Sequence, residues 1–379
     1  MPSLRVGHFT DSFPPIINGV STLVAELHAE LRAQHQDSHV FIVGPDRGVV
    51  DPPNVWRTRG FRLGTSQFYG SVQLNQQAWR MAQTLNVIHA HDSLAIGRMA
   101  AYTAMKTRRP LVFTNHTRHD IYVLNFPRIW QPILRAYAFW TIRLLMRAST
   151  ITTAPSSDAA RWLKTVAPDS AHKVRVVHNG VRLDRFDCDP AGLSRAQFNI
   201  DPGATIFITV SRLAPEKNLQ LFAEALRRAV GAGANAHWIV IGDGPSRLPL
   251  QAQLAPIYDR VHFLGFIPNP QIAPYLAIAD VCATSSLSET NCISVIEGMA
   301  CGLPYLGVRA DWWEDFTGGN EAGLITPRDA GALAAAIRNL CDDEQLRRRL
   351  AVNTRPLSRK FDIRTIAAQW VELYQELAA

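Results

Sequence analysis

The feature that most constrains the fold of this 379-residue chain is a repeated alternation of short β-rich apolar runs with helix-length amphipathic segments. This alternation is typical of parallel sheets covered by helices, because parallel strands need long crossover connections. The sequence therefore predicts the α/β class. Strands are expected in the first half at 4–9, 39–43, 87–91, 111–114, 150–154 and 174–177, with helices at about 20–33, 72–85, 93–105 and 158–166.

A second series of strands starts after a polar stretch. Expected strands at 204–210, 237–241, 260–264, 281–284 and 305–307 again alternate with helices. Residues 178–202 contain Asn-Gly and several Pro and Gly, so we predict a domain boundary near Asn179. Ligands of such sheets bind beyond the carboxyl ends of the strands, and two of these domains facing each other would form a cleft.

Composition supports two globular domains. At roughly 100 to 200 residues per domain, a chain that is 47% hydrophobic and 19% charged predicts about two cores. The five cysteines form no C-x-x-C pair and no export signal precedes them, which predicts a reducing, cytosolic location. The best candidate for a membrane-spanning helix, 129–146, is interrupted by Gln131, Arg135 and Arg143, so no membrane span is expected.

Positive charge is concentrated in the first half. Residues 1–178 carry 20 Lys and Arg against 10 Asp and Glu, whereas residues 179–379 carry 19 against 22. The excess predicts an anionic partner for the first half, and composition leaves nucleic acid, an anionic membrane surface and an acidic substrate open.

Two segments that follow predicted strands suit an anionic ligand. The loop 10–20 ends in Gly19 at a helix start, where backbone N–H groups favour an anion, although a plain turn is equally compatible. Arg212 and Lys217 follow the first strand of the second half. Two cations at this position suit a diphosphate, and the alternative is a pair of solvated charges at a helix start.

Two carboxylates lie eight residues apart near an apolar helix. Glu289 is expected in a loop or first turn and Glu297 two turns later on the same side, where a carboxylate can accept hydrogen bonds from a ribose diol. The alternative is helix capping by Ser288 or Thr290 with Glu297 at the surface. An unpaired acid within so apolar a helix would be costly, which favours a functional role.

This stretch resembles the E-x7-E signature of retaining glycosyltransferases of family four, which have the GT-B architecture of two Rossmann-like domains facing a cleft. Other landmarks of the family occur in order along almost the whole chain. They are Asn18-Gly19-Val20, Val177-His178-Asn179-Gly180-Val181, Ser211-Arg212-Leu213 with Lys217, Ile241-Gly242-Asp243-Gly244-Pro245, and Phe263-Leu264-Gly265.

The resemblance implies a nucleoside-diphosphate sugar, with a UDP-sugar favoured, bound mainly by a donor domain at 179–362. Arg212 and Lys217 would bind the diphosphate, Glu297 the ribose and Glu289 the sugar hydroxyls. Ile293 would lie beside the nucleotide, and Gly19 would close over the phosphates. Gly19 belongs to an acceptor-side domain at 1–178, to which a C-terminal helix at 363–379 would cross back.

The resemblance also assigns a histidine. His116 follows a first-half strand and matches the cleft histidine of the family, which contacts the transferred sugar near the reaction centre. Arg118 and His119 fit either an acceptor site or an ordinary surface. The chain departs from the family at Asn291-Cys292, where relatives often carry Phe-Gly beside the sugar, so the resemblance does not identify the sugar.

The segment 128–147 mixes aromatic residues and arginines at helical spacing, as interfacial membrane helices do, although a core helix with snorkelling arginines fits too. Residues 106–147 contain eight basic residues and one acid. In this basic aromatic patch the chain resembles glycolipid-forming members of the family, including diacylglycerol glycosyltransferases. We therefore expect a lipid or glycolipid acceptor and a peripheral location on an anionic membrane surface, at the inner face of the cell membrane, with no nucleic acid partner.

No metal or other cofactor is expected. Asp187-Cys188-Asp189 resembles a D-x-D metal motif but lies at the predicted domain junction, and the cations Arg212 and Lys217 can neutralise a diphosphate. The predicted function is retaining, metal-independent hexosyl transfer by front-side substitution, because no carboxylate is an evident nucleophile. The alternatives are a mannosyl- or glucosyltransferase with a soluble or polysaccharide-precursor acceptor, a GT-B sugar-nucleotide epimerase, and a nonenzymatic sugar-nucleotide sensor.

Overall fold

The apolar runs of the first half form a seven-stranded parallel sheet in the computed structural model, which describes residues 4–14, 16, 19–44, 51–62, 69–71, 73–316 and 321–379. The strand order is β3-β2-β1-β6-β7-β8-β9. The strands are β1 Arg5–Thr10, β2 Asp37–Gly44, β3 Val55–Arg59, β6 Val87–Ala90, β7 Leu111–Thr114, β8 Ile151–Ala154 and β9 Val174–Val176.

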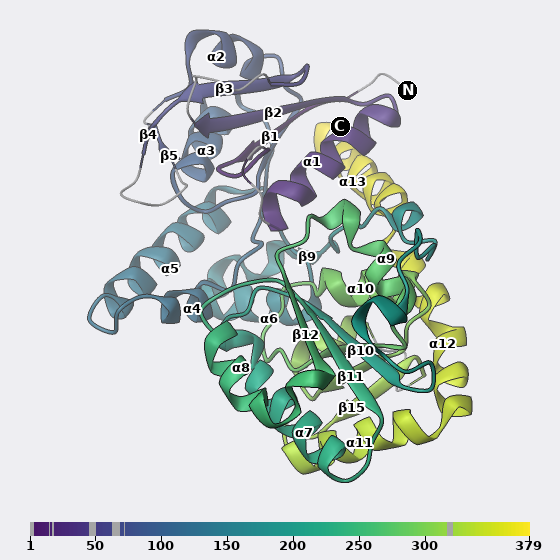
Figure 1. Ribbon diagram of the computed structural model, residues 1–379. Helices are drawn as coiled ribbons and strands as arrows, with labels where there is room; N and C mark the ends of the chain where they lie inside the picture. Colours follow the sequence, from purple (N-terminus) through teal and green to yellow (C-terminus); the bar gives the residue numbers. More distant parts are fainter. Residues whose placement is uncertain are drawn as a thin grey trace. The chain divides into compact units, whose positions relative to one another are not determined.

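Helices cover both faces of this sheet (Figure 1). One face packs against α1, Gly19–Ala33, and α13, Ile363–Ala378, which lie side by side. The other packs against α2 Gln76–Ala82, α3 Ala95–Thr107, α5 Gln131–Ala148 and α6 Ser157–Val166. Unit 1 therefore consists of residues 1–180 together with 363–379.

Unit 2, residues 181–362, is a second parallel sheet with helices on both faces. Its strands, in the order β12-β11-β10-β13-β14-β15, are β10 Thr205–Val210, β11 Ala236–Ile241, β12 Val261–Gly265, β13 Val281–Thr284, β14 Tyr305–Val308 and β15 Gly323–Thr326. Its principal helices are α7 Leu219–Gly231, α8 Arg247–Leu254, α9 Ala273–Ile278, α10 Ile293–Ala300, α11 Ala330–Asp342 and α12 Glu344–Ser358.

The predicted α/β class is confirmed, and the differences from the predicted elements lie mainly at sheet edges. Strands β3 and β15 were not expected; each pairs with one neighbour only. An edge strand has less surface to bury, so its sequence is less apolar, as the two arginines of β3 illustrate. The helix expected at 72–85 is shortened to α2 because Asn75 Oδ1 caps it, 2.9 Å from Ala78 N. Asn18 and Val72 lie outside the described residues.

The strand order of each unit reverses once, between β1 and β6 in unit 1 and between β10 and β13 in unit 2. Loops that leave the carboxyl ends of two such strands diverge to opposite faces of the sheet and leave a crevice, which is where ligands of this fold class bind. The loops after β1 and β6 carry Asp11 and His91, and those after β10 and β13 carry Arg212 and Glu289. A ligand site is therefore expected at each of these two sheet edges.

Candidate active site

In unit 2 the structure brings Lys217 and Glu289 together. Lys217 ends a short 3-10 turn after β10, and Glu289 lies in the loop between β13 and α10. Lys217 Nζ donates to Glu289 Oε1 at 2.6 Å, and the two side chains are only 19% and 13% exposed. Burial by itself lowers the pKa of Lys217, but the adjacent Glu289 carboxylate outweighs it and the pKa is raised. Lys217 is therefore a stable cation at the strand-order reversal.

Arg212 lies on the same loop and is half-exposed. Its guanidinium is paired with the carboxylate of Glu216, four residues further along the chain. Both cations predicted to bind a diphosphate thus have a carboxylate partner. A diphosphate reaching them would exchange one anionic partner for another, which costs less than desolvating two unpaired cations.

The Arg212 loop rests on a glycine turn that follows β11. Gly242 has φ of +130°, and a Cβ there would lie 1.9 Å from the Ser211 carbonyl oxygen. Leu213 N donates to the Asp243 carbonyl oxygen at 2.9 Å, so the two loops are joined by backbone hydrogen bonds. Only glycine permits this approach. Gly242 therefore shapes the turn that supports Arg212.

Glu297 is buried within α10, with 3% of its surface exposed. Asn269 Nδ2 donates to Glu297 Oε1 at 2.5 Å, a partner that the sequence did not indicate. Burial raises the pKa of the neighbouring Cys282 thiol to about 12, and the Glu297 charge contributes to this shift. Glu289 lies outside the helix, so the predicted helical relationship between the two glutamates does not apply. Each glutamate instead has its own partner.

The N-terminus of α10 differs from the capping alternative. Helix α10 begins at Ile293 with Cys292 as N-cap and no capping side chain, so neither Ser288 nor Thr290 caps it. Asn291 and Cys292 are buried. The uncapped first turn, with Ile293 at its start, leaves backbone N–H groups available to an anion.

In unit 1 Gly19 is the first residue of α1. A Cβ added there meets no atom within 4 Å among the described residues, and its φ is not in the left-handed region. The fold therefore does not require glycine at this position. Glycine at this position would instead allow a ligand to approach the backbone closely, and the open space around the Cβ position leaves room for one.

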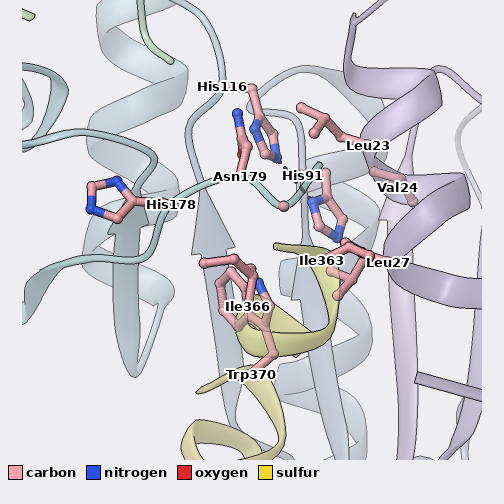
Figure 2. A pocket seen from close by; sticks show the side chains of 11 residues that line it. Leu23, Val24, Leu27, His91, His116, His178, Asn179, Ile363, Ile366 and Trp370 are labelled. Atoms are coloured by element: carbon pink, nitrogen blue, oxygen red, sulfur yellow. Dashed lines mark hydrogen bonds between the residues drawn. The ribbon is translucent and has the colours of Figure 1, made fainter. Parts of the chain in front are cut away.

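His116 follows β7 and lines a small cavity of about 20 Å³, which has room for one water or one hydroxyl group (Figure 2). The returning helix α13 supplies part of the wall through Ile363, Ile366 and Trp370. Gly180 lies against this helix, since a Cβ there would be 2.4 Å from Ile363 Cδ1. The glycine of the landmark at 177–181 is thus explained by close packing of the chain on α13.

His116 belongs to a buried chain of imidazoles that the sequence analysis missed. Its Nε2 lies 3.1 Å from His91 Nδ1, and His91 Nε2 lies 3.0 Å from His8 Nδ1. Burial lowers the pKa of His116 to about 4 and that of His8 to about 3, and it also holds the pKa of His91 far below its usual value. All three imidazoles are therefore neutral at pH 7. The run His-Ala-His-Asp at 89–92, at the end of a predicted strand, was the available signal.

A pair of buried carboxyl groups lies at the same edge of the sheet. Asp92 Oδ2 accepts from Asp11 N at 3.0 Å and from Thr10 Oγ1 at 3.1 Å. Burial and the neighbouring Asp92 raise the pKa of Asp11 well above its usual value, and burial also raises the pKa of Asp92. Since two donors already stabilise a charge on Asp92, Asp11 is the member that favours the proton.

Two groups of residues contain side chains of the types that bind metal ions. Nitrogen atoms of His8, His89 and His91 lie within 4.8 Å of one another, the one group of this kind among the described residues. Both His89 nitrogens already have hydroxyl partners, Tyr374 at 2.7 Å and Thr114 at 2.6 Å, so the group is a hydrogen-bond network. Asp187 and Asp189 are exposed, and Asp189 Oδ1 accepts from Ala191 N, as in a loop turn.

Arg118 has a structural role. Its guanidinium pairs with Asp120 and Asp158, each at 2.9 Å, and lies over the Trp162 ring. These contacts tie the loop after β7 to α6. His119 is largely buried, which lowers its pKa to about 4.

The segment 122–144 forms an exposed apolar surface, which we call the α5 surface. It is made of Tyr122, Leu124, Phe126, Ile129, Trp130, Ile133, Tyr137, Trp140 and Leu144, each at least 37% exposed. The last five recur every three or four residues, whereas Ala138, Ile142 and Leu145 bury the opposite face of α5. Arg128 and Arg135 are exposed beside the aromatic residues. The aromatic face of α5 is therefore not core, and among the described residues no helix is long and apolar enough to cross a membrane.

Each of the two units matches a glycosyltransferase family. The family described as Glycosyltransferase Family 4 matches residues 17–185, and that described as Glycosyl transferases group 1 matches residues 192–356. An alpha-monoglucosyldiacylglycerol synthase of Streptococcus pneumoniae is 25% identical over 323 residues, 80% of this chain and 70% of the relative. The synthase of that name from Acholeplasma laidlawii is 23% identical over 354 residues, 85% of this chain and 84% of the relative.

The fold also matches solved structures. Anabaena Alr3699/HepE, crystallised in complex with UDP and glucose, superposes with a TM-score of 0.76 at 20% sequence identity, covering 99% of this chain and 100% of that one. At this identity the likeness supports the fold, which is GT-B.

Proposed function

Because this chain belongs to the GT-B glycosyltransferases, with a family 4 first unit and a group 1 second unit, we propose that it transfers a hexose from a UDP-sugar to a membrane lipid. The proposed acceptor is diacylglycerol or a glycolipid, and the anomeric configuration of the sugar is retained. The observation that carries the acceptor is the α5 surface, an apolar aromatic helix face flanked by arginines.

The donor assignment rests on the residues after β10 and β13. In this proposal Arg212 and Lys217 bind the diphosphate, Glu289 the sugar hydroxyls, Glu297 the ribose, and Ile293 lies beside the nucleotide. The partly buried Lys217–Glu289 pair supports the proposal because one charged group is positioned for phosphate and the other for hydroxyls. Gly19 of unit 1 is assigned to the phosphates because its Cβ position is open.

Charge development explains why cations are needed. When the C1–O bond of the donor breaks, negative charge accumulates on the departing diphosphate. Fixed cations in a partly buried site stabilise that charge without reorganising. Lys217, whose pKa is raised, stays protonated throughout, and the uncapped first turn of α10 adds N–H donors. These groups can supply the charge that a divalent ion would otherwise provide, so we propose metal-independent transfer.

Retention is proposed to proceed by front-side substitution. A double displacement needs a carboxylate nucleophile at the far face of the sugar. Glu289 is engaged by Lys217 and Glu297 by Asn269, so both signature carboxylates already have partners. In the proposed reaction the acceptor oxygen attacks C1 from the face that the diphosphate leaves, and the acceptor proton goes to a diphosphate oxygen. His116 contacts the transferred sugar.

The lipid acceptor has support from two sides. Both named relatives are alpha-monoglucosyldiacylglycerol synthases by name. The α5 surface exposes Trp130 and Trp140 by 55% and 51%, and aromatic residues with flanking arginines favour the boundary between lipid headgroups and acyl chains. Peripheral binding through this surface would bring a water-insoluble acceptor to the enzyme.

The test is transfer by the full chain in the presence of EDTA. Radiolabelled UDP-glucose is incubated with vesicles of phosphatidylglycerol containing diacylglycerol, with the same vesicles lacking diacylglycerol, and with soluble sugar acceptors. Label in an α-linked glycolipid, dependent on diacylglycerol, supports the proposal. Transfer to a soluble acceptor only, an epimerised sugar nucleotide, or binding without turnover would each replace it with one of the alternatives.

A further inference from the structure

The three imidazoles of His8, His91 and His116 form one continuous hydrogen-bonded chain. His8 lies within β1, His91 directly after β6 and His116 two residues after β7, so neighbouring strands of one sheet position them. The joining distances are 3.0 and 3.1 Å, and burial keeps each ring neutral at pH 7. Figure 2 shows the His91 and His116 rings in contact at the wall of the cavity.

The number of protons on three neutral imidazoles allows this hydrogen-bonded chain two arrangements of its N–H groups. A neutral imidazole carries one N–H and one lone pair, and each joining hydrogen bond needs one of each. In the first state His91 Nδ1 donates to His116 Nε2. His91 Nε2 then carries the lone pair, so it accepts from His8 Nδ1. All three rings then carry the proton on Nδ1. Reversing one bond reverses the other, so the alternative has all three protons on Nε2.

The two ends of the chain decide between these states. His8 Nε2 and His116 Nδ1 are buried and have no hydrogen-bond partner among the described residues. The all-Nε2 state would place an unpaired N–H on His8, which does not line the cavity. The all-Nδ1 state places it on His116, which does. A buried donor without a partner is costly, and of the two end residues only His116 lines a cavity with room for a water or a hydroxyl group.

We propose that His91 and His8 are positioning residues that hold His116 as a neutral Nδ1–H donor toward a substrate oxygen. In this state the Nε2 lone pair of His116 is occupied by His91, so His116 donates a hydrogen bond and does not act as a general base. The recipient is a hydroxyl or phosphate oxygen. Its identification as part of a sugar nucleotide or acceptor rests on the proposed function, whereas the tautomer of the chain does not.

The surroundings hold the central ring in place. His89 lies with its ring centroid 3.9 Å from that of His91, and its own nitrogens are bound by Tyr374 and Thr114. Trp370 of α13 lies 4.6 Å from the His89 ring centroid. The returning C-terminal helix thus braces the chain from the side opposite the sheet.

The direct test is NMR of the full-length protein labelled with ¹⁵N-histidine. Long-range ¹H–¹⁵N correlations distinguish protonated from bare nitrogens in each ring, and the spectra of His8→Phe, His91→Asn and His116→Asn assign the three signals. The expected result at pH 7 is an Nδ1–H on all three rings. An Nε2–H on any of the three, or a charged ring, would overturn the proposal, whatever reaction the protein catalyses.

Kinetics with UDP-glucose and diacylglycerol vesicles separate positioning from folding. His91→Phe removes the donor to His116 and is expected to lower kcat about 10-fold or more, with KM for UDP-glucose within about twofold. His91→Asn places an amide N–H where Nδ1 was and should recover most of kcat. His28→Phe is the matched control, because His28 is a buried histidine of the same unit bonded to Ser38.

Equal losses for His91→Phe and His28→Phe, or no recovery with His91→Asn, would show that His91 matters only for folding. If the wild type transfers no sugar at all, the proposed function fails. The ¹⁵N spectra of the wild type then still decide whether the chain holds His116 as an Nδ1–H donor.

Discussion

Lys217 and Glu289 lie 72 positions apart in the sequence, yet Lys217 Nζ donates a 2.6 Å hydrogen bond to Glu289 Oε1 at the strand-order reversal of unit 2. The pair joins the loop after β10 to the loop after β13. It therefore fixes two of the groups that the proposed donor site requires, and its two members are expected to respond differently to substitution.

Lys217→Ala should lower kcat by about 10²-fold or more, because the cation matters most when charge grows on the departing diphosphate. Arg212→Ala should behave similarly. Steady-state kinetics with UDP-glucose measure both. Arg227→Ala, which breaks an exposed pair with Glu224, is the matched control and should leave kcat unchanged. A variant that raised only KM would show that the residue binds the donor without stabilising the transition state.

The loss in Lys217→Ala must be separated from damage to the fold. Removing one partner of this partly buried pair leaves the other charge unpaired, so Lys217→Ala should also destabilise unit 2. The double variant Lys217→Ala, Glu289→Gln removes the orphaned charge and should recover part of the stability. It should not recover kcat. Recovery of both would assign the pair to structure alone.

Glu297→Gln should weaken UDP binding by about 1 to 3 kcal/mol, because a ribose hydroxyl loses a charged acceptor. Calorimetry with UDP and with 2′,3′-dideoxy-UDP checks this. Wild type should bind the dideoxy ligand more weakly than UDP, and Glu297→Gln should scarcely distinguish the two. If the variant kept the full preference for UDP, Glu297 would not contact the ribose and its bond to Asn269 would be its role.

Gly19→Ala should fold normally and impair transfer. The added Cβ meets no described atom within 4 Å, so the melting temperature should change little. A methyl group between the backbone and a bound phosphate should raise KM for the donor. Gly180→Ala is the contrasting variant, since its Cβ would collide with Ile363 and lower the melting temperature. Unchanged kinetics in Gly19→Ala would place the donor phosphates elsewhere.

The α5 surface should bind anionic membranes. Each basic residue near such a surface contributes roughly 1 kcal/mol, over a Debye length of about 8 Å at physiological salt. Replacing Arg128, Arg135, Trp130 and Trp140 together with Ser should abolish cosedimentation with phosphatidylglycerol vesicles and leave UDP binding unchanged. The control replaces Leu248, Val352 and Arg338, exposed residues of unit 2, with Ser. Absence of wild-type binding even at low salt would favour a soluble acceptor.

Acid should destabilise unit 1 through its buried histidines. His8 binds a proton below pH 6.5 when unfolded but only near pH 3 when folded, so the unfolded state holds the extra proton between these values. The contribution of His8 to the free energy of unfolding is constant above pH 6.5. Below pH 6.5 it falls by about 1.4 kcal/mol per pH unit, down to about pH 3. Urea unfolding at pH 7 and pH 5 should therefore show a smaller loss in His8→Phe than in wild type. Equal losses would mean that His8 is protonated in the folded state.

Periodicity alone was enough to predict the fold class. The strands β7 and β13 begin and end where the apolar runs predicted them, because central strands of a parallel sheet must be apolar on both faces. The edge strands β3 and β15 were not expected, although the edge strand β12 was; β3 contains two arginines, which an edge position tolerates. The family resemblance identified the loops after β10 and β13, because ligand-binding loops of such sheets keep a fixed position relative to their strands.

Only the tertiary structure decided which side chains meet. The sequence could not show that Lys217 is bound by Glu289, that Glu297 is bound by Asn269, or that His8, His91 and His116 form one chain, because these contacts join residues far apart in the sequence. It also left α5 undecided between core and surface. The helical periodicity of its aromatic residues is the same in both cases, and only the packing of Ala138, Ile142 and Leu145 against unit 1 leaves Trp130 and Trp140 exposed.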